Sequence, residues 1–216
     1  SQLFDARNDG EEWSREHVLR SFETVLASYE RTLGQDFSDT LDKGYQALGS
    51  WFDAYHESFA AQTLNEFRVN GVLIPIPGSD ELIRLTGVLD KLELDDNGRD
   101  VVVVDYKTGK PKTRNDIMGN TKSSNGNYYR QLVFYKLLLD NFADGRYRMT
   151  AGEIDFVEPD TKGAFRKESF AIEPQEAHEL TETIQNMAQS VLNLEFWDIE
   201  PDPDVNEYAD LVNMLR

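Results

Sequence analysis

Four consecutive valines at positions 101–104 constrain this chain more than any other feature. A β-branched run without a polar break predicts a strand that is buried on both faces. The run leads directly into Asp105, Tyr106 and Lys107. Because side chains alternate along a strand, we expect Asp105 and Lys107 to point to one side and Tyr106 to the other. Charged groups at the end of a buried strand are costly unless they pair or bind a ligand, so this strand predicts a functional site.

A second strand is predicted over residues 85–94, and an Asn97-Gly98 pair, typical of a hairpin turn, connects it to the valine strand. A two-residue loop there places Asp90 opposite Asp105, with Cβ atoms about 4.5–5.5 Å apart. A divalent cation between the two carboxylates would remove their repulsion, whereas an odd-numbered loop or a bulge would separate them. The apolar face expected for the second strand carries Val88, Asp90, Leu92 and Leu94.

Three short motifs occur in order: GVLD at 87–90, DYKTGK at 105–110 and QLVFY at 131–135. Together they resemble the PD-(D/E)XK nuclease superfamily, and most closely the RecB-like nuclease domain at the C-terminus of UvrD/Rep-type DNA helicases. The resemblance covers roughly residues 60–195. It implies an α/β (α+β) fold with a restriction-endonuclease-like core, in which helices flank a mixed central sheet. The implied activity is hydrolysis of DNA phosphodiester bonds in repair or recombination.

The resemblance also implies a metal site. Asp90, Asp105 and the carbonyl oxygen of Tyr106 would hold Mg²⁺ or Mn²⁺, which are hard ions that favour oxygen ligands. The metal would activate the water that attacks phosphorus. Related nucleases often carry a cysteine-ligated iron–sulfur cluster, but this chain has no cysteine, which excludes one.

Three further residues receive roles from the resemblance. Lys107 would orient the attacking water and stabilise charge on the phosphate. Gln131 and Tyr135, one helical turn apart, would position the DNA backbone. Two alternatives stay open on the residues alone: Asp105 and Lys107 form an ion pair that caps the strand, and Gln131 satisfies nearby backbone groups.

The formal net charge of −18 argues against a protein that coats nucleic acid generally, because phosphate repels such a surface. One segment after the valine strand is basic, however, and has Asp116 as its only acid. It predicts phosphate contacts on DNA, or else a solvated loop of ordinary lysines. Most of the segment, up to Asn127, is polar and is expected to be a mobile loop over the site. The candidate DNA-binding residues are Lys110, Lys112, Arg114, Lys122, Tyr128 and Arg130.

The chain divides into an N-terminal helical pair over 1–62, which belongs to the same domain, a nuclease core over 63–195 and an acidic tail over 196–216. Residues 1–13 are expected to be frayed. Ser14 and Ser38 are candidate caps for the two helices. A buried helix is expected over 128–142, a hairpin over 149–172, and a last helix from Pro174. A short helix is expected at the end of the tail.

No apolar run approaches the length of a membrane span, and the absence of cysteine fits a reducing compartment. We therefore expect the cytoplasm of a bacterium or an archaeon. The expected partners are DNA, as single strands or duplex ends, and helicase domains of the same full-length chain, with no membrane partner.

The pattern departs from RecB-like domains in one respect. These domains often place a histidine on an early helix as an extra metal ligand, and the only histidines here are His17, His56 and His178. Each is expected on the surface, as is the extra acid Glu66. This departure leaves two alternatives open: a nuclease-fold module that binds DNA or a helicase without cutting, and a structural interaction domain.

Overall fold

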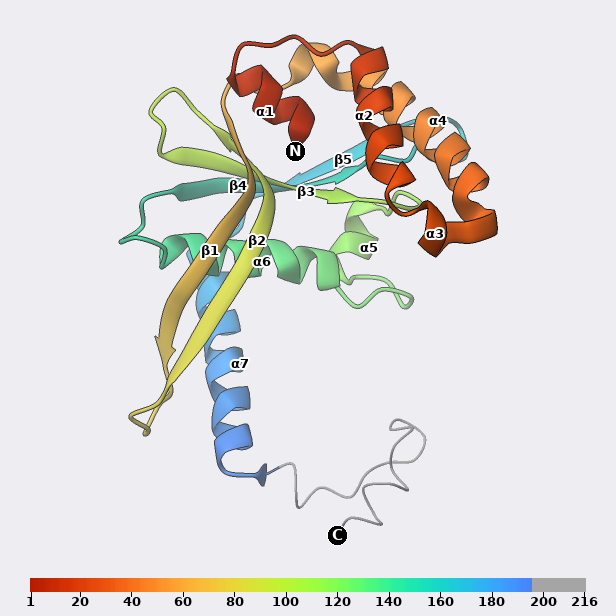
Figure 1. The fold of residues 1–216 in the computed structure, drawn as a ribbon. Helices are drawn as coiled ribbons and strands as arrows, with labels where there is room; N and C mark the ends of the chain where they lie inside the picture. The colour runs from red at the N-terminus through yellow and green to blue at the C-terminus, as the bar shows by residue number, and fades with distance from the viewer. Residues whose placement is uncertain (196–216) are drawn as a thin grey trace, which may run out of the picture.

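The computed structural model describes residues 1–195 and contains a sheet with the strand order β1-β2-β3-β4-β5 (Figure 1). Strands β3 and β4 are parallel, whereas every other neighbouring pair is antiparallel, so the sheet is mixed as predicted. The strands are β1 (Thr63–Pro75), β2 (Leu82–Leu94), β3 (Asp100–Lys107), β4 (Arg148–Phe156) and β5 (Arg166–Phe170).

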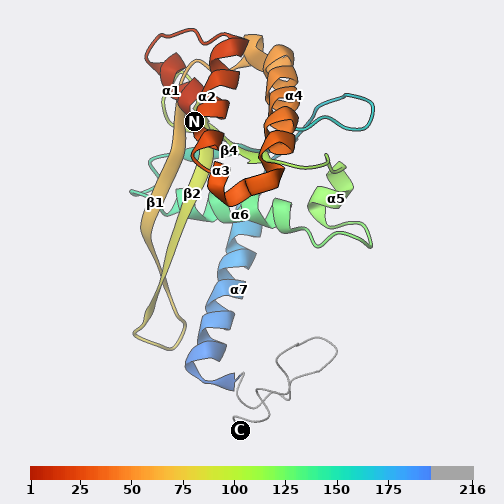
Figure 2. The same ribbon diagram turned by 45° about the vertical axis from the view of Figure 1, so that its right-hand side comes forward.

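Helices cover both faces of the sheet (Figures 1 and 2). Helices α6 and α7 contribute to the larger hydrophobic core on one face, whereas α1, α2 and α4 contribute to a smaller aromatic core on the other. The helices are α1 (Gln2–Asn8), α2 (Arg15–Ala27), α3 (Glu30–Leu33), α4 (Phe37–Tyr55), α5 (Arg114–Met118), α6 (Asn127–Asp140) and α7 (Pro174–Leu192), with short 3₁₀ turns η1 (Gly34–Asp36) and η2 (His56–Ser58). No helix within residues 1–195 is long and apolar enough to cross a membrane.

The β2–β3 hairpin has the predicted register but not the predicted loop. Lys91 lies opposite Val104, so continuing the register would bring Asp90 opposite Asp105. The loop is wider than two residues because the side chain of Asn97 accepts hydrogen bonds from two N–H groups that follow it, at 2.7 and 2.9 Å. The last backbone hydrogen bond between the two strands runs from the N–H of Asp95 to the carbonyl of Asp100, at 3.0 Å. Since the loop gains an even number of residues, the facing of every side chain is preserved.

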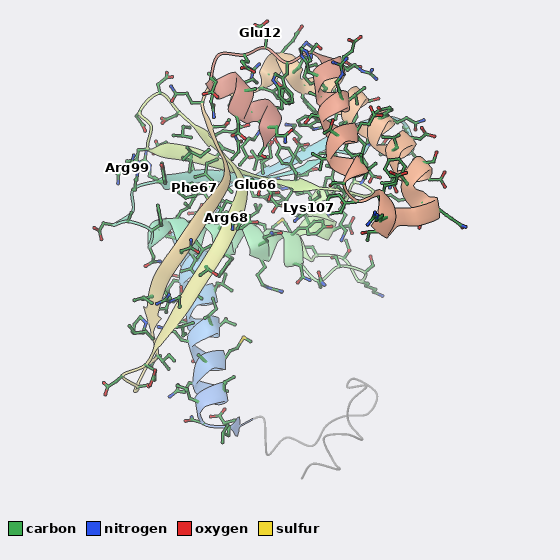
Figure 3. All side chains as sticks on the ribbon, in the orientation of Figure 1. Glu12, Glu66, Phe67, Arg68, Arg99 and Lys107 are labelled. Atoms are coloured by element: carbon green, nitrogen blue, oxygen red, sulfur yellow. The ribbon has the colours of Figure 1, made fainter. Side chains whose placement is uncertain are left out.

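Strand β1 is continuous from Thr63 to Pro75, but its backbone is distorted at Glu66. Leu64 and Phe67 are three residues apart, yet both pack against the core beneath α6. Residues three apart in a regular strand face opposite sides, so the backbone must depart from regular strand geometry between them. Glu66 supplies this departure with a φ of 50°, in the left-handed region that non-glycine residues seldom adopt. Figure 3 shows Glu66 partway along β1, where the strand crosses β2 in this view.

Strand β2 changes its facing at the same level. Leu89 and Leu92 both lie in the core beneath α6, with Asp90 between them. The prediction that Val88 shares an apolar face with Leu92 was therefore wrong, and Val88 is 38% exposed. Simple alternation fails here because both paired strands change the face to which their side chains point at the same level, while their register is kept. The alternation of residues in one strand does not reveal this change.

Two segments are more ordered than predicted. Residues 1–13 include α1, in which Phe4 is buried against Trp51 and Phe59, so the expectation of a frayed start was wrong. The segment expected to be a loop over the site contains α5, where Thr113 caps the helix and Ile117 is fully buried.

The other expected helices form with small shifts in their ends. Ser14 caps α2 as predicted, but α4 begins at Phe37, so Ser38 is not its cap. Helices α6 and α7 form where the buried helix and the last helix were expected. The acidic tail at 196–216 and its expected short helix lie outside the described residues.

Candidate active site

A closed ring of polar contacts joins the end of β3 to α6. Tyr135 donates a hydrogen bond from its hydroxyl to Oδ1 of Asp105 at 2.9 Å, and accepts one from Nε2 of Gln131 at 2.7 Å. Oε1 of Gln131 accepts from Nζ of Lys107 at 2.7 Å, and the same Nζ lies 2.5 Å from Oδ2 of Asp105. Because Gln131 and Tyr135 are four residues apart on α6, one helical stripe holds both.

Asp90 joins this group from β2. Its Oδ2 accepts a hydrogen bond from the backbone N–H of Tyr106 at 2.9 Å, directly after Asp105 in the chain. The described β2–β3 backbone pairing stops at Lys91, so a carboxylate takes the place of the next main-chain partner. The two acids therefore converge on the same end of β3, as the hairpin register predicts.

Burial dominates the electrostatics of Asp105, which is 1% exposed. Desolvation raises the pKa of this carboxyl above its usual value, and the nearby charge of Asp90 acts in the same direction. The contacts with Lys107 and Tyr135 oppose the rise. Burial also raises the pKa of Tyr135, helped by Asp105, so this hydroxyl stays protonated and remains a donor at neutral pH.

Tyr106 points away from the ring, as alternation predicts. Its ring stacks on Phe4 with centroids 6.3 Å apart and meets Trp51 edge-on at 5.8 Å, both on the opposite face of the sheet. Burial raises the pKa of its hydroxyl far above the usual range. The strand thus sends its polar residues to one face and this aromatic residue to the other.

The sequence profile of the PD-(D/E)XK nuclease superfamily matches residues 2–206, almost the whole chain. The chain belongs to this superfamily. Members are usually nucleases and typically use divalent metals such as Mg²⁺.

A solved structure titled "Crystal structure of SSO0001" is 15% identical, with 78% of this chain and 70% of that chain covered at a TM-score of 0.42. No curated protein matched the sequence.

The residues at the end of β3 suit the divalent metal that superfamily members use. Oδ2 of Asp105 is buried and pairs with Nζ of Lys107 at 2.5 Å, which leaves the second lone pair of this oxygen for a cation. No cluster of three or more His, Cys, Asp and Glu side chains suited to a metal occurs in that range. Asp90 and Asp105 would therefore be the only carboxylate ligands. Mg²⁺ accepts such a set, because it commonly binds one or two carboxylates and keeps several waters.

Part of the basic segment lies beside the ring. Nζ of Lys107 is 4.9 Å and Nζ of Lys112 is 4.5 Å from the ring centroid of Tyr128, so one aromatic ring gathers two cations. Lys110 and Lys122 are exposed and form no ion pair within the described range.

The two arginines of the segment bind the protein itself. Arg114 donates to the carbonyl of Ser169 at 2.8 Å and lies 4.0 Å from the ring centroid of Phe170. Arg130 donates to the side chain of Asn127 and to the carbonyl of Asn125. The structure therefore brings Lys112 and Tyr128 to the site, whereas the two arginines have partners elsewhere.

The histidines and Glu66 lie on the surface, as expected. His17 accepts the N–H of Ser14 in the cap of α2, and His56 stacks on Phe52. Sequence reasoning missed Glu158, whose carboxylate accepts the N–H of Gly109 just beyond Lys107. Only the parallel pairing of β3 with β4 brings them together, and no motif in the sequence indicates that pairing.

Proposed function

We propose that this domain is a Mg²⁺- or Mn²⁺-dependent deoxyribonuclease that hydrolyses phosphodiester bonds. One observation carries the proposal: Asp90 and Asp105, from neighbouring strands, converge at the end of β3, where Lys107 contacts the second acid. An ion pair alone would cap the strand. The nearby second carboxylate adds like charge that a divalent cation would offset.

The chain's own residues divide the work. Asp90, Asp105 and the carbonyl of Tyr106 would hold the metal, which would supply Lewis-acid stabilisation and a more acidic water. Lys107 brings a positive charge to the non-bridging phosphate oxygens and orients the attacking water. Gln131 holds Nζ of Lys107 at 2.7 Å.

Tyr135 completes the positioning of the ring. Its hydroxyl connects Gln131 to Asp105. Helix α6 therefore contacts both Asp105 and Lys107, the two charged residues at the end of β3. Residues whose geometry is set before the substrate binds need no rearrangement during the reaction, which is the main source of electrostatic catalysis. Both α6 residues would also face the DNA backbone.

DNA would approach across Tyr128 and Lys112. A base can stack on an aromatic face, and lysine side chains pair with successive phosphates. Lys110 and Lys122 would extend the phosphate contacts. Arg114 and Arg130 would contribute only by leaving their present partners.

We further propose that the domain is RecB-like and acts beside helicase domains of the UvrD/Rep type, in the same full-length chain, in DNA repair or recombination. Its setting would be the cytoplasm of a bacterium or an archaeon. The order and composition of the three motifs support this assignment.

A cleavage assay tests the proposal. We would incubate the domain with single-stranded and duplex DNA and Mn²⁺, beside Asp105→Ala and Lys107→Ala. Each substitution should lower the rate by about 10²–10³-fold or more, because each removes charge stabilisation at the reacting phosphate. Lys162→Ala, at an exposed lysine of the β4–β5 connection, is the matched control and should cleave normally.

A second candidate function is a nuclease-fold module that binds DNA without cutting it. It is favoured by the net charge of −18 and by the lack of a third acid or histidine at the site in residues 1–195. Metal-dependent DNA binding without cleavage by the wild type would support this alternative and refute the nuclease.

A further inference from the structure

Two hydrogen bonds tie the chain to β4 just after β3 ends. The N–H of Val157 donates to the carbonyl of Lys107 at 3.1 Å, and the N–H of Gly109 donates to Oε1 of Glu158 at 2.8 Å. The first continues the parallel pairing of β3 with β4. The second extends that pairing beyond the strand, with a side chain in place of a backbone acceptor.

Glu158 also contacts the N-terminal helical layer. Nζ of Lys43, on α4, lies 3.1 Å from the same Oε1. The Lys43 side chain is 68% exposed, whereas that of Glu158 is 20% exposed. Exposed ion pairs contribute little, so the hydrogen bond to Gly109 is the contact that fixes the carboxylate.

The chain changes direction at Gly109, where φ is 99°. A glycine adopts this conformation without strain, but it is also the most flexible residue, so the turn needs an external contact to hold it. Lys107 lies two residues before this turn and must place Nζ between Asp105 and Gln131. A turn that is free to move would loosen the backbone from which the lysine projects.

We propose that Glu158 is a positioning residue, which holds the turn at Gly109 and thereby fixes Lys107 for catalysis. The inference rests on the proposed nuclease function. Within residues 1–195, Glu158 forms no hydrogen bond or ion pair with the ring residues, and it acts through the backbone N–H that it accepts.

The test uses the whole chain and four variants. Glu158→Ala removes the acceptor, whereas Glu158→Gln keeps an oxygen that can accept the N–H of Gly109. Lys43→Ala removes only the ion pair, and Glu182→Ala, at an exposed acid of α7, is the control. Hydrogen–deuterium exchange over residues 108–113 and steady-state cleavage of DNA with Mn²⁺ are measured for each protein.

Glu158→Ala should exchange the Gly109 amide roughly tenfold faster, because its hydrogen bond is lost. It should also lower kcat by about tenfold or more with little change in KM, since a misplaced catalytic group costs rate rather than binding. Glu158→Gln should restore both values, and the variants at Lys43 and Glu182 should stay near the wild type.

The proposal would be overturned if Glu158→Ala exchanged the Gly109 amide at the wild-type rate, or if it kept the wild-type kcat. Equal loss of kcat in Glu158→Ala and Glu158→Gln would also overturn it, because the charge and not the acceptor would then matter. A wild type that does not cleave refutes the nuclease and the positioning role of Glu158 in cleavage together. The exchange data would still show separately whether Glu158 holds the turn.

Discussion

The two faces of the sheet both bury lysine–carboxylate pairs, but they surround them differently. On the α6 face, Lys107 contacts Asp105. On the opposite face, Lys167 lies 2.8 Å from Asp155, and Lys91 lies 2.7 Å from Glu93. Ion pairing therefore does not distinguish the proposed active site from the rest of the molecule.

The opposite face carries a network of three carboxylates and two lysines, in which Lys167 also lies 3.6 Å from Glu153. Asp155 is 0% exposed and accepts a hydrogen bond from Nε1 of Trp51 at 3.3 Å, in addition to its pair with Lys167. Nζ of Lys91 lies 4.1 Å from the ring centroid of Phe4. Aromatic side chains from α1 and α4 thus contact these charges, although the side chains of Lys167 and Glu93 stay 26% and 29% exposed, and these contacts indicate a structural role.

On the α6 face, the partners are an incomplete match. Lys107 is 18% exposed at the side chain, and its other partner is the neutral amide of Gln131. Asp90 adds a second negative charge beside Asp105 and helps to raise its pKa. The α6 face therefore differs in where its charges lie, at the strand end where the β2–β3 pairing stops, rather than in burial or net charge.

The largest expected effect is a loss in the free energy of unfolding when an ion pair on the opposite face is broken. Lys167→Met should lower the free energy of unfolding by about 3–5 kcal/mol, because it leaves the carboxylate of Asp155 buried without its cation. Urea denaturation measures the change, with the exposed Lys162→Met as control. Cleavage per folded molecule should be unchanged. A loss below about 1 kcal/mol would remove the distinction between the two faces.

A smaller effect of opposite sign is expected on the α6 face. Asp105→Asn should raise the metal-free free energy of unfolding at pH 7 by about 0.5–2 kcal/mol, as relief of active-site strain often does. Because the folded pKa of Asp105 is raised, the contribution of this residue to wild-type stability is greatest below the unfolded pKa of about 3.9 and is lost as pH rises through the folded value.

The pH dependence checks this sign. Thermal unfolding without metal, followed from acid to neutral pH, should show the advantage of Asp105→Asn growing as pH rises. An advantage that is constant with pH, or a variant less stable than the wild type at pH 7, would contradict the raised pKa.

The smallest expected effect concerns the distorted backbone of β1 at Glu66. Glu66→Gly should raise the free energy of unfolding by about 1 kcal/mol, because glycine adopts the left-handed φ of 50° without the steric cost. Glu66→Ala keeps that cost and should give no gain. Equal stability of the two variants in urea denaturation would show that the backbone at Glu66 is not strained.

The local features of the fold follow from the sequence more readily than the long-range ones. The valine run predicts buried β3, and the Asn-Gly pair predicts the hairpin and its register. Alternation then places Tyr106 on the other face of the sheet from Asp105, because strand geometry repeats every two residues. The ring with α6 needed the superfamily resemblance, since no local rule brings Gln131 to Lys107.

Other features depend on contacts that no short pattern encodes. The change of facing in β2 near Asp90 accompanies the left-handed backbone of Glu66 in its partner strand, so the parity of one strand alone misplaced Val88. Phe4 is ordered by aromatic residues from distant segments, which a polar N-terminal sequence does not indicate. The hydrogen bond from Gly109 to Glu158 arises from strand pairing across 49 residues.

Calorimetric titration with Mn²⁺ measures whether Asp90 and Asp105 hold a metal. The proteins compared are the wild type, Asp90→Asn, Asp105→Asn and the opposite-face control Glu153→Gln. If Asp90 and Asp105 share one cation, the wild type and the control should bind one Mn²⁺ with equal affinity, and each active-site variant should bind at least about tenfold more weakly, having lost one of two carboxylate ligands. Wild-type affinity in both active-site variants would contradict the account.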